Sequence, residues 1–235
     1  MQQYFCDHKP EVGKYYFLNK EQEHHAKNVL RLENEVIRLV FQKKAYFAKI
    51  AHYNDGYACL VKEEDLNNNE LQQDITLCMA LIKKDKFELI LQKAAELGVK
   101  RIIPLITSRT IVKVCKEKED KVHKRYQQIV LEASQQCKRN QVPEILKACT
   151  INDLKNYLST ENIVAYEALH QTHNIFDPEI KDSTTIVIGP EGGFSEKEIA
   201  NMLAIGYKPI SLGKRILRAE TAALFTISIL AMKEI

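Results

Sequence analysis

The sequence predicts an α/β protein in which a small β-rich region precedes a larger domain with a parallel sheet. In residues 1–61, short β-rich runs follow one another closely, as is typical of a small barrel or meander. From Ile75 onward, continuous apolar runs alternate with segments of helical periodicity, which is the pattern of βαβ units. The 235 residues suffice for one to two domains with a substantial core.

The N-terminal region is predicted to contain one helix and at least three strands. The helix is expected from Glu21 to about Leu32, with Ala26, Val29 and Leu30 facing inward. The strands are expected at 36–41, 46–50 and 57–61. Residues 62–74 have almost no apolar content and are interpreted as a linker. We therefore predict domains at 1–70 and 74–235.

The second domain opens with a predicted βαβ unit. The apolar run 75–82 is typical of a strand buried on both faces. Asp85 and Glu88 have the spacing of a capping box, and Gly98 stands where a helix would end. The next strand is expected over 99–106, broken by Pro104.

The remaining elements continue this alternation. Helices are predicted at 121–139, from a capping box at Ser195 and Glu198 to Gly206, and from Ala219 to about Lys233. The buried stripe of the first is expected to comprise Val122, Tyr126, Ile129, Val130, Ala133 and Cys137. Strands are predicted at 163–166, 185–189 and 209–212. The last helix is apolar on nearly every side, so a second subunit is expected to cover part of it.

Composition excludes several classes of protein. The chain is 45% hydrophobic and 28% charged, with a net charge of +3, which argues against disorder and fibrous repeats. No apolar stretch approaches the ~18 residues of a membrane span, and we expect no secretory signal. The six cysteines include no CxxC pair, so we expect free thiols and a cytoplasmic location. His170 and His173 lack further ligands nearby, so no metal is expected.

Two glycine-bearing loops are the candidate ligand sites. Each lies between a buried strand and a helix, at 189–195 and 212–221, where α/β sheets bind ligands. Tight βα turns are the simpler alternative. Neither loop has the spacing of a nucleotide-phosphate motif, and Glu191 would repel a pyrophosphate. The loops therefore favour a ligand that carries positive charge.

These residues carry a family resemblance. IGPEGGFSEKEI followed by LGKRILRAETAAL resembles the signature of the SPOUT methyltransferases, and closely that of the bacterial 16S ribosomal RNA uridine-N3 methyltransferases. HHAKNVLR, LILQKAAELGVKRIIPLITSR and EASQQCKRNQVPEI resemble the other blocks of that family, in order and spacing. The resemblance spans nearly the whole chain.

The resemblance implies a fold and a cofactor. It implies an N-terminal PUA-like barrel that binds RNA and a SPOUT α/β domain with a deep C-terminal trefoil knot. The knot would hold S-adenosylmethionine, and two subunits would pair through the knot region. The implied donor-binding residues are Ala165, Tyr166, Glu167, Gly189, Pro190, Glu191, Gly192, Gly193, Leu212, Gly213, Ile216, Leu217 and Thr221.

The implied reaction is methylation of N3 of a specific uridine in 16S ribosomal RNA of the small ribosomal subunit. Uracil N3 becomes a good nucleophile only when its proton leaves, and a cation beside the ring would stabilise the anion. Arg218 is our first candidate for that cation and Arg139 the second, while Glu220 or a water would take the proton. RNA contacts are expected from His25, Lys27, Arg31, Lys84, Arg109 and Lys138.

Two alternatives stay open from the sequence. The same fold could methylate another target, such as a ribose 2′-hydroxyl. The chain could also be a catalytically silent RNA-binding protein of ribosome assembly. Because both loops are retained, including Arg218 and Thr221, we favour the enzyme.

Overall fold

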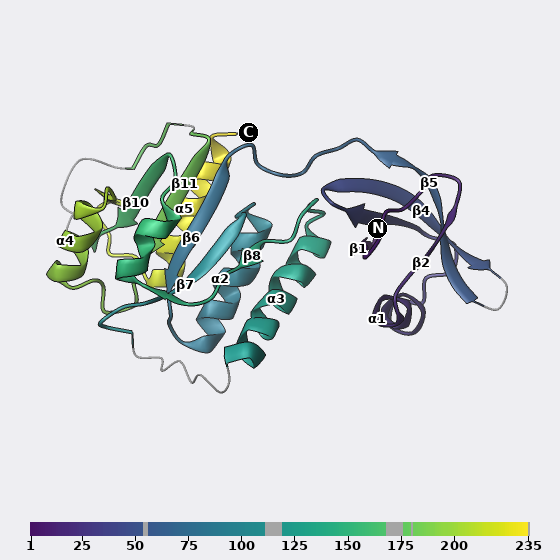
Figure 1. The fold of residues 1–235 in the computed structure, drawn as a ribbon, viewed down its shortest axis with the longest axis horizontal. Coiled ribbons are helices and arrows are strands. Elements are labelled where there is room, and N and C mark those ends of the chain that lie inside the picture. Colours follow the sequence, from purple (N-terminus) through teal and green to yellow (C-terminus); the bar gives the residue numbers. More distant parts are fainter. Residues whose placement is uncertain (54–55, 111–118, 168–175, 180, 235) are drawn as a thin grey trace. The chain divides into compact units, whose positions relative to one another are not determined.

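The computed structural model describes residues 1–53, 56–110, 119–167, 176–179 and 181–234 (Figure 1). It contains two compact units. The first comprises Met1–Glu70 together with Ser134–Gln141, and the second comprises Leu71–Ala133 with Val142–Ile235. The segment 134–141 thus groups with residues from the start of the chain, although it lies far from them in sequence.

The first unit contains a curled five-stranded sheet with the order β1-β3-β4-β5-β2. The strands are β1 (Gln3–Phe5), β2 (Tyr15–Phe17), β3 (Val36–Phe41), β4 (Lys44–Tyr53) and β5 (Gly56–Asp65). Strands β3, β4 and β5 pair antiparallel in succession, so the predicted meander is confirmed. The core includes Tyr4, Ile37, Leu39, Ile50 and Val61, each at most 2% exposed.

The predicted N-terminal helix is wrong in its form and in its buried face. The structure has a short helix α1 (Lys20–His24) followed by one π-helical segment η1 (His25–Val29), and the chain turns away at Arg31, which has a φ of +54°. Ala26 is buried as predicted, but Val29 and Leu30 are 59% and 40% exposed. A π-helical turn rotates side chains away from the 3.6-residue period on which the prediction rested.

The predicted linker is shorter than the polar composition suggested. Strand β5 continues to Asp65, whose carboxylate accepts a hydrogen bond from the Arg38 guanidinium at 2.7 Å. Both side chains are buried, which explains why a polar segment can end a strand.

The second unit is built on a parallel sheet, as predicted. Its strands are β6 (Asp74–Ala80), β7 (Arg101–Ile106), β8 (Glu144–Ile145), β9 (Cys149–Thr150), β10 (Glu161–Ala165), β11 (Ser183–Ile188) and β12 (Lys208–Ile210). The order is β12-β10-β11-β6-β7-β8, with β9 also paired to β7, and every pairing is parallel. The two-residue strands β8 and β9 were not predicted because they are too short to show a period.

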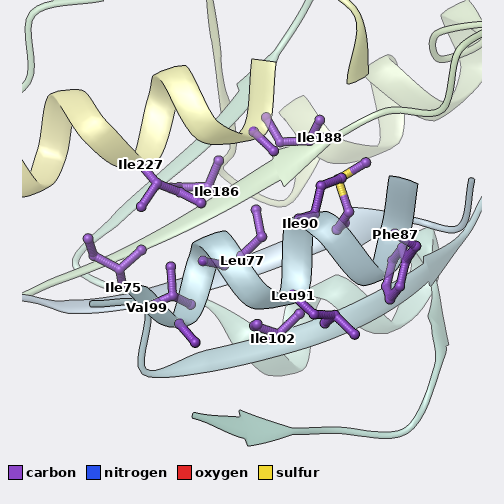
Figure 2. Close-up of a cluster of buried hydrophobic side chains, with 14 of the residues drawn as sticks. Ile75, Leu77, Phe87, Ile90, Leu91, Val99, Ile102, Ile186, Ile188 and Ile227 are labelled. Carbon is purple, nitrogen blue, oxygen red and sulfur yellow. The ribbon is translucent and has the colours of Figure 1, made fainter. Parts of the chain in front are cut away.

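Helices cover both faces of this sheet. They are α2 (Lys84–Glu96), α3 (Glu119–Gln136), α4 (Glu196–Ala204), α5 (Ala219–Met232) and the 3₁₀ segment η3 (Ile151–Tyr157). One cluster packs Leu77 and Ile186 of the sheet against α2, α3 and α5, and Figure 2 shows Ile90 of α2 and Ile227 of α5 on this side. A second cluster packs Val187 and Val164 of the alternate face against α4 and η3. The alternation of side chains along each strand produces this three-layer arrangement.

Two local predictions in this unit are wrong. Pro104 does not break its strand. On one side of β7, β8 pairs with Arg101–Ile102 and β9 pairs with Leu105–Ile106, so no hydrogen bond between strands on that side requires an N–H from Pro104. Asp85 and Glu88 form no capping box, because the N-cap of α2 is Lys83, two residues before Asp85. The Asp85 carboxylate instead lies in the first turn, where its negative charge interacts favourably with the helix dipole.

The helix ends in this unit follow the sequence signals more closely. Ser195 and Glu198 form the predicted capping box at the start of α4. Gly98 and Gly206 have φ of +89° and +101°, the conformation expected just beyond a helix end. In the predicted stripe of α3, Ile129 and Val130 are buried, but Val122 is 42% exposed.

Two expectations from composition concern the chain as a whole. The described cysteines Cys6, Cys59, Cys78, Cys137 and Cys149 are free thiols, as predicted. Cys115 lies outside the described residues. Throughout the described ranges, no helix is long and apolar enough to cross a membrane.

Candidate active site

Loops that follow three neighbouring strands converge on one cavity in the second unit. Strands β12, β10 and β11 are adjacent and parallel, so their carboxyl ends meet at the same edge of the sheet. The cavity has a volume of about 460 Å³, within the range of about 300–1,000 Å³ typical of small-molecule sites. Its position is the one at which open α/β sheets bind ligands.

The predicted donor residues gather around this cavity. Three predicted loops contribute lining residues, which are Ala165, Tyr166, Glu167, Gly189, Pro190, Glu191, Gly192, Gly193, Leu212, Gly213, Ile216 and Leu217. Thr221 is exposed on α5 and does not line the cavity. Residues far apart in sequence therefore share one site.

The loop after β11 requires its glycines. Gly193 has a φ of +66°, and a Cβ atom there would lie 2.1 Å from Oε1 of Glu167. A Cβ at Gly189 would lie 3.0 Å from the ring of Phe194. Gly193 thus allows the loop to pack closely against the loop after β10, and Gly189 leaves room for the Phe194 ring of the same loop.

Replacing Gly193 with valine should weaken ligand binding at this cavity by more than about tenfold. The substitution forces the Glu167 carboxylate to move and strains a backbone with positive φ. Calorimetric titration with S-adenosylmethionine measures the change. Gly206→Ala is a matched control, since Gly206 also has positive φ, but a Cβ atom there would have no atom within 4 Å and the residue does not line the cavity. Equal affinity of wild type and Gly193→Val would contradict this account.

Charged side chains line the cavity on different elements. Glu167 and Glu191 follow β10 and β11, while Lys86, Arg215 and Arg218 come from α2 and the segment before α5. Lys86 and Arg215 were not among the predicted site residues, although Arg215 belongs to the predicted loop 212–221. Lys86 lies in the first turn of α2, just beyond β6, which neighbours β11. Knowledge of the strand order would have identified it.

Arg218 is available for chemistry. It is the N-cap of α5, it is exposed, and its backbone carbonyl accepts the first helical hydrogen bond from Ala222 at 2.8 Å. Its guanidinium makes no hydrogen bond or ion pair with any part of the chain that the structure describes. Its backbone is thus fixed by the helix, and the residue lines the cavity.

Glu220 forms an ion pair with Lys86, a residue that lines the cavity. Its Oε1 lies 3.1 Å from Nζ of Lys86. Burial alone would raise the pKa of Glu220, but hydrogen bonds from its own backbone N–H and Lys86, with the charges of Lys86 and Arg218, lower it below the usual range. Glu220 does not itself line the cavity. The structure therefore gives it a direct contact with Lys86.

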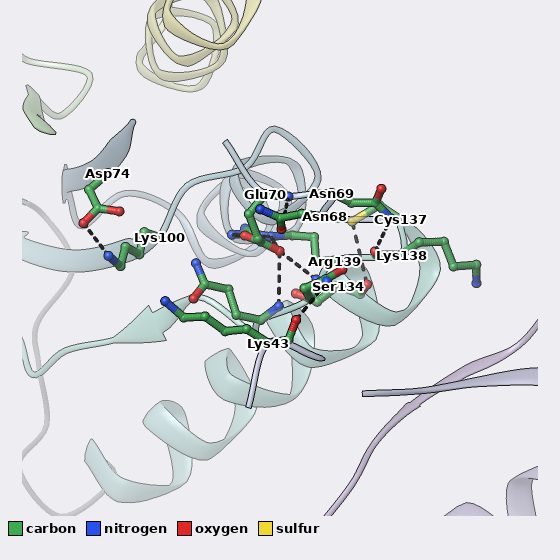
Figure 3. A network of polar contacts seen from close by, with 12 residues as sticks. Lys43, Asn68, Asn69, Glu70, Asp74, Lys100, Ser134, Cys137, Lys138 and Arg139 are labelled. Carbon is green, nitrogen blue, oxygen red and sulfur yellow. Dashed lines mark hydrogen bonds and ion pairs between the residues drawn. The ribbon is translucent and has the colours of Figure 1, made fainter. Parts of the chain in front are cut away.

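Arg139 belongs to the first unit, where its side chain forms an ion pair with Glu70 (Figure 3). Nη2 of Arg139 lies 2.5 Å from Oε2 of Glu70, and Arg139 is 3% exposed. Glu70 also accepts hydrogen bonds from the backbone N–H groups of Asn140 and Gln141 at 2.7 and 3.1 Å. The second-choice catalytic arginine is thus part of a buried ion pair and does not line the cavity.

The predicted RNA contacts have different surroundings. Lys27, Arg31 and Lys84 are exposed, and Nδ1 of His25 lies 3.0 Å from the Tyr4 hydroxyl. Arg109 donates to the carbonyl of Gly192 at 2.6 Å, so it contacts the loop after β11.

Lys138 is half-buried, and its ammonium donates to the carbonyl of Gln135 at 3.1 Å. Burial, with the nearby charge of Arg38, lowers the pKa of Lys138. Among the described residues no cluster of His, Cys, Asp or Glu could hold a metal ion. His170 and His173 lie outside the described residues.

The fold and the cavity define a class, an α/β protein that binds a small ligand at the edge of a parallel sheet. Residues 69–231 match the family model described as an RNA methyltransferase domain. Two similar relatives are each named ribosomal RNA small subunit methyltransferase E. The protein from Mesomycoplasma hyopneumoniae (strain 232) is 34% identical over 97% of this chain and 98% of its own. The one from Bacillus subtilis (strain 168) is 32% identical over 97% and 95%.

A solved structure agrees with these sequence relatives. It is a ribosomal RNA small subunit methyltransferase E from Neisseria gonorrhoeae bound to S-adenosyl methionine, with a TM-score of 0.87 and 30% identity. The similarity covers 99% of this chain and 97% of the Neisseria chain. The chain therefore belongs to the RNA methyltransferase family.

Proposed function

We propose that this protein transfers a methyl group from S-adenosylmethionine to N3 of a specific uridine in 16S ribosomal RNA of the small ribosomal subunit. The observation that carries the proposal is the convergence of twelve expected donor residues on one cavity. Relatives named ribosomal RNA small subunit methyltransferase E support the substrate, and the Neisseria structure supports the donor. The same proposal places the protein in the cytoplasm, where ribosomal RNA is modified.

The cavity fits S-adenosylmethionine in size and chemistry. Leu212, Ile216 and Leu217 offer apolar surface for the faces of an adenine ring, and the loop backbones offer donors and acceptors for its edge. Glu167 and Glu191 suit the positive charge of the donor. When bound, the donor supplies an activated methyl group on a sulfonium, which leaves as a neutral thioether.

The acceptor requires help from the protein. Arg218 would stabilise the uracil anion and so lower the pKa of N3–H, because its guanidinium stays protonated and carries no other ion pair among the described residues. The lowered pKa of Glu220 makes that carboxylate a weak base, and its Lys86 partner, unlike Glu220 itself, lines the cavity. We therefore propose that water accepts the N3 proton and that Glu220 orients Lys86.

Three structural expectations belong to this proposal. The C-terminal segments would form a trefoil knot around the donor, and the first unit would be a PUA-like RNA-binding domain. Two copies would pair through the knot region. The exposed face of α5 supports this pairing, since Phe225 and Met232 are 42% and 65% exposed on a mostly apolar helix.

Binding of single-stranded RNA should weaken with salt at a slope of about −4 in log K against log salt. Each phosphate neutralised on a single strand contributes about −0.7, and six residues are expected to contact phosphates. These are His25, Lys27, Arg31, Lys84, Arg109 and Lys138. Titration by fluorescence anisotropy from 50 to 300 mM salt, roughly the range over which such slopes are measured, tests this value. A flat response would exclude the proposed contacts.

Methyl transfer from labelled S-adenosylmethionine tests the proposed function directly. Small ribosomal subunits and their naked RNA serve as substrates, and mass spectrometry identifies the methylated nucleoside. We expect 3-methyluridine at one site. A 2′-O-methylated nucleoside would move the assignment to the ribose. Donor binding without any methylated product would favour the silent RNA-binding alternative.

A further inference from the structure

Glu198 is a buried carboxylate that joins two separate loops. It is 8% exposed and lies in the first turn of α4. It accepts hydrogen bonds from the backbone N–H and the hydroxyl of Ser195, both at 2.9 Å. It also accepts from the backbone N–H and the hydroxyl of Ser108, at 2.7 and 2.9 Å. One carboxylate thus accepts hydrogen bonds from four donors on two residues, Ser108 and Ser195, which lie 90 and 3 positions away in the sequence.

Only half of this arrangement is needed to start the helix. A capping box requires reciprocal bonds between Ser195 and Glu198, which α4 has. The two bonds to Ser108 do nothing for the helix end. They bind the turn after β7, which belongs to a different part of the sheet. Burial alone would raise the pKa of Glu198, but the four hydrogen bonds lower it, so the group is ionised and acts only as an acceptor.

The two loops joined by Glu198 meet again beside the cavity. Ser195 lies two residues beyond Gly193, which lines the cavity. Arg109, the neighbour of Ser108, donates to the carbonyl of Gly192 at 2.6 Å. Its side chain also lies about van der Waals distance, 3.6 Å, from the point where a Cβ of Gly192 would stand. The turn after β7 therefore contacts the lining segment 189–193 directly at Gly192, and it is also joined through Glu198 to Ser195, just beyond that segment.

We propose that Glu198 is a positioning residue for the donor loop, acting through Ser108 and Ser195. By tying the turn after β7 to the start of α4, it fixes the backbone of residues 189–193 in the shape that accepts S-adenosylmethionine. This inference rests on the proposed function. It predicts that the donor-binding surface depends on Ser108, a residue that does not line the cavity.

The test compares donor binding in Glu198→Gln and Ser108→Ala with the full-length wild type. Glutamine replaces one acceptor oxygen with an amide that faces N–H donors, and alanine removes one hydroxyl donor. We expect the Kd for S-adenosylmethionine to rise about 10- to 100-fold in Glu198→Gln and several-fold in Ser108→Ala, as for bonds to a charged group. The donor KM should rise in parallel, while kcat at saturating donor should stay within about twofold. Ser108→Thr keeps the hydroxyl and should restore wild-type affinity.

Asp153→Asn is the matched control for loss of a capping box. Asp153 accepts from the N–H and hydroxyl of Thr150 at 2.8 and 2.6 Å, but it joins no second loop among the described residues and does not line the cavity. The Asp153→Asn variant should have a lower melting temperature but an unchanged Kd for S-adenosylmethionine. Wild-type affinity in both Glu198→Gln and Ser108→Ala would overturn the proposal, and so would an equal loss in Asp153→Asn. Failure of the wild type itself to bind S-adenosylmethionine would instead overturn the proposed function.

Discussion

Replacing Arg218 with alanine should slow methyl transfer by about 10²- to 10³-fold, while the fold and the donor affinity remain close to wild type. This loss is typical when one preorganised group that stabilises developing charge is removed. Arg218 lines the cavity, is anchored by its place at the N-terminus of α5, and makes no ion pair with any described residue. Its charge therefore remains for the substrate. Single-turnover rates at saturating donor, with melting temperature and donor Kd, separate these effects.

Lys214→Ala is the control for this variant. Lys214 is an exposed cation four residues away that does not line the cavity, so its loss should leave the rate within about twofold of wild type. Arg218→Lys keeps the charge but loses the planar fork, and an intermediate rate is expected. A rate for Arg218→Ala within tenfold of wild type would remove Arg218 from the reaction.

The two glycine-bearing loops of the candidate site could be predicted from the sequence because each is local, and the family resemblance implied the individual lining residues. Each loop directly follows a buried strand, and parallel strands present their carboxyl ends at one edge. Glycines in 189–193 and apolar residues in 212–217 therefore met at the cavity without any knowledge of strand order. Lys86 was missed because its approach depends on β6 lying beside β11, a long-range pairing. Thr221 does not line the cavity, because motif membership does not define which face of a helix a residue occupies.

The fold shows the same division between local and distant information. The periodicity of 84–96 and the apolar run of α5 specified their helices. The π-helical segment at 25–29 departs from that period, and Pro104 is tolerated only because two short strands leave a gap beside it. The grouping of 134–141 with the first unit rests on buried polar contacts between residues about 70 to 140 positions apart. No window of sequence contains such contacts.

Replacing Glu70 with alanine should destabilise the first unit by about 3–5 kcal/mol. The change leaves the Arg139 guanidinium, 3% exposed, without its carboxylate, and it removes the acceptor for two backbone N–H groups of 140 and 141. Removing one partner of a buried ion pair costs far more than the pair contributes, because an uncompensated charge stays buried. The sequence has no tryptophan whose fluorescence could report unfolding. Backbone hydrogen exchange in urea, followed in peptides of the first unit, is therefore the suitable measurement of stability.

The control for this variant is Glu11→Ala. Glu11 pairs with Lys14 on the surface of the same unit, with both side chains more than half exposed, so its loss should leave the stability unchanged. Replacing both members of the buried pair, as in Glu70→Leu with Arg139→Met, should recover part of the loss, because no unpaired charge remains. If Glu70→Ala were as stable as Glu11→Ala, the ion pair would not organise 134–141.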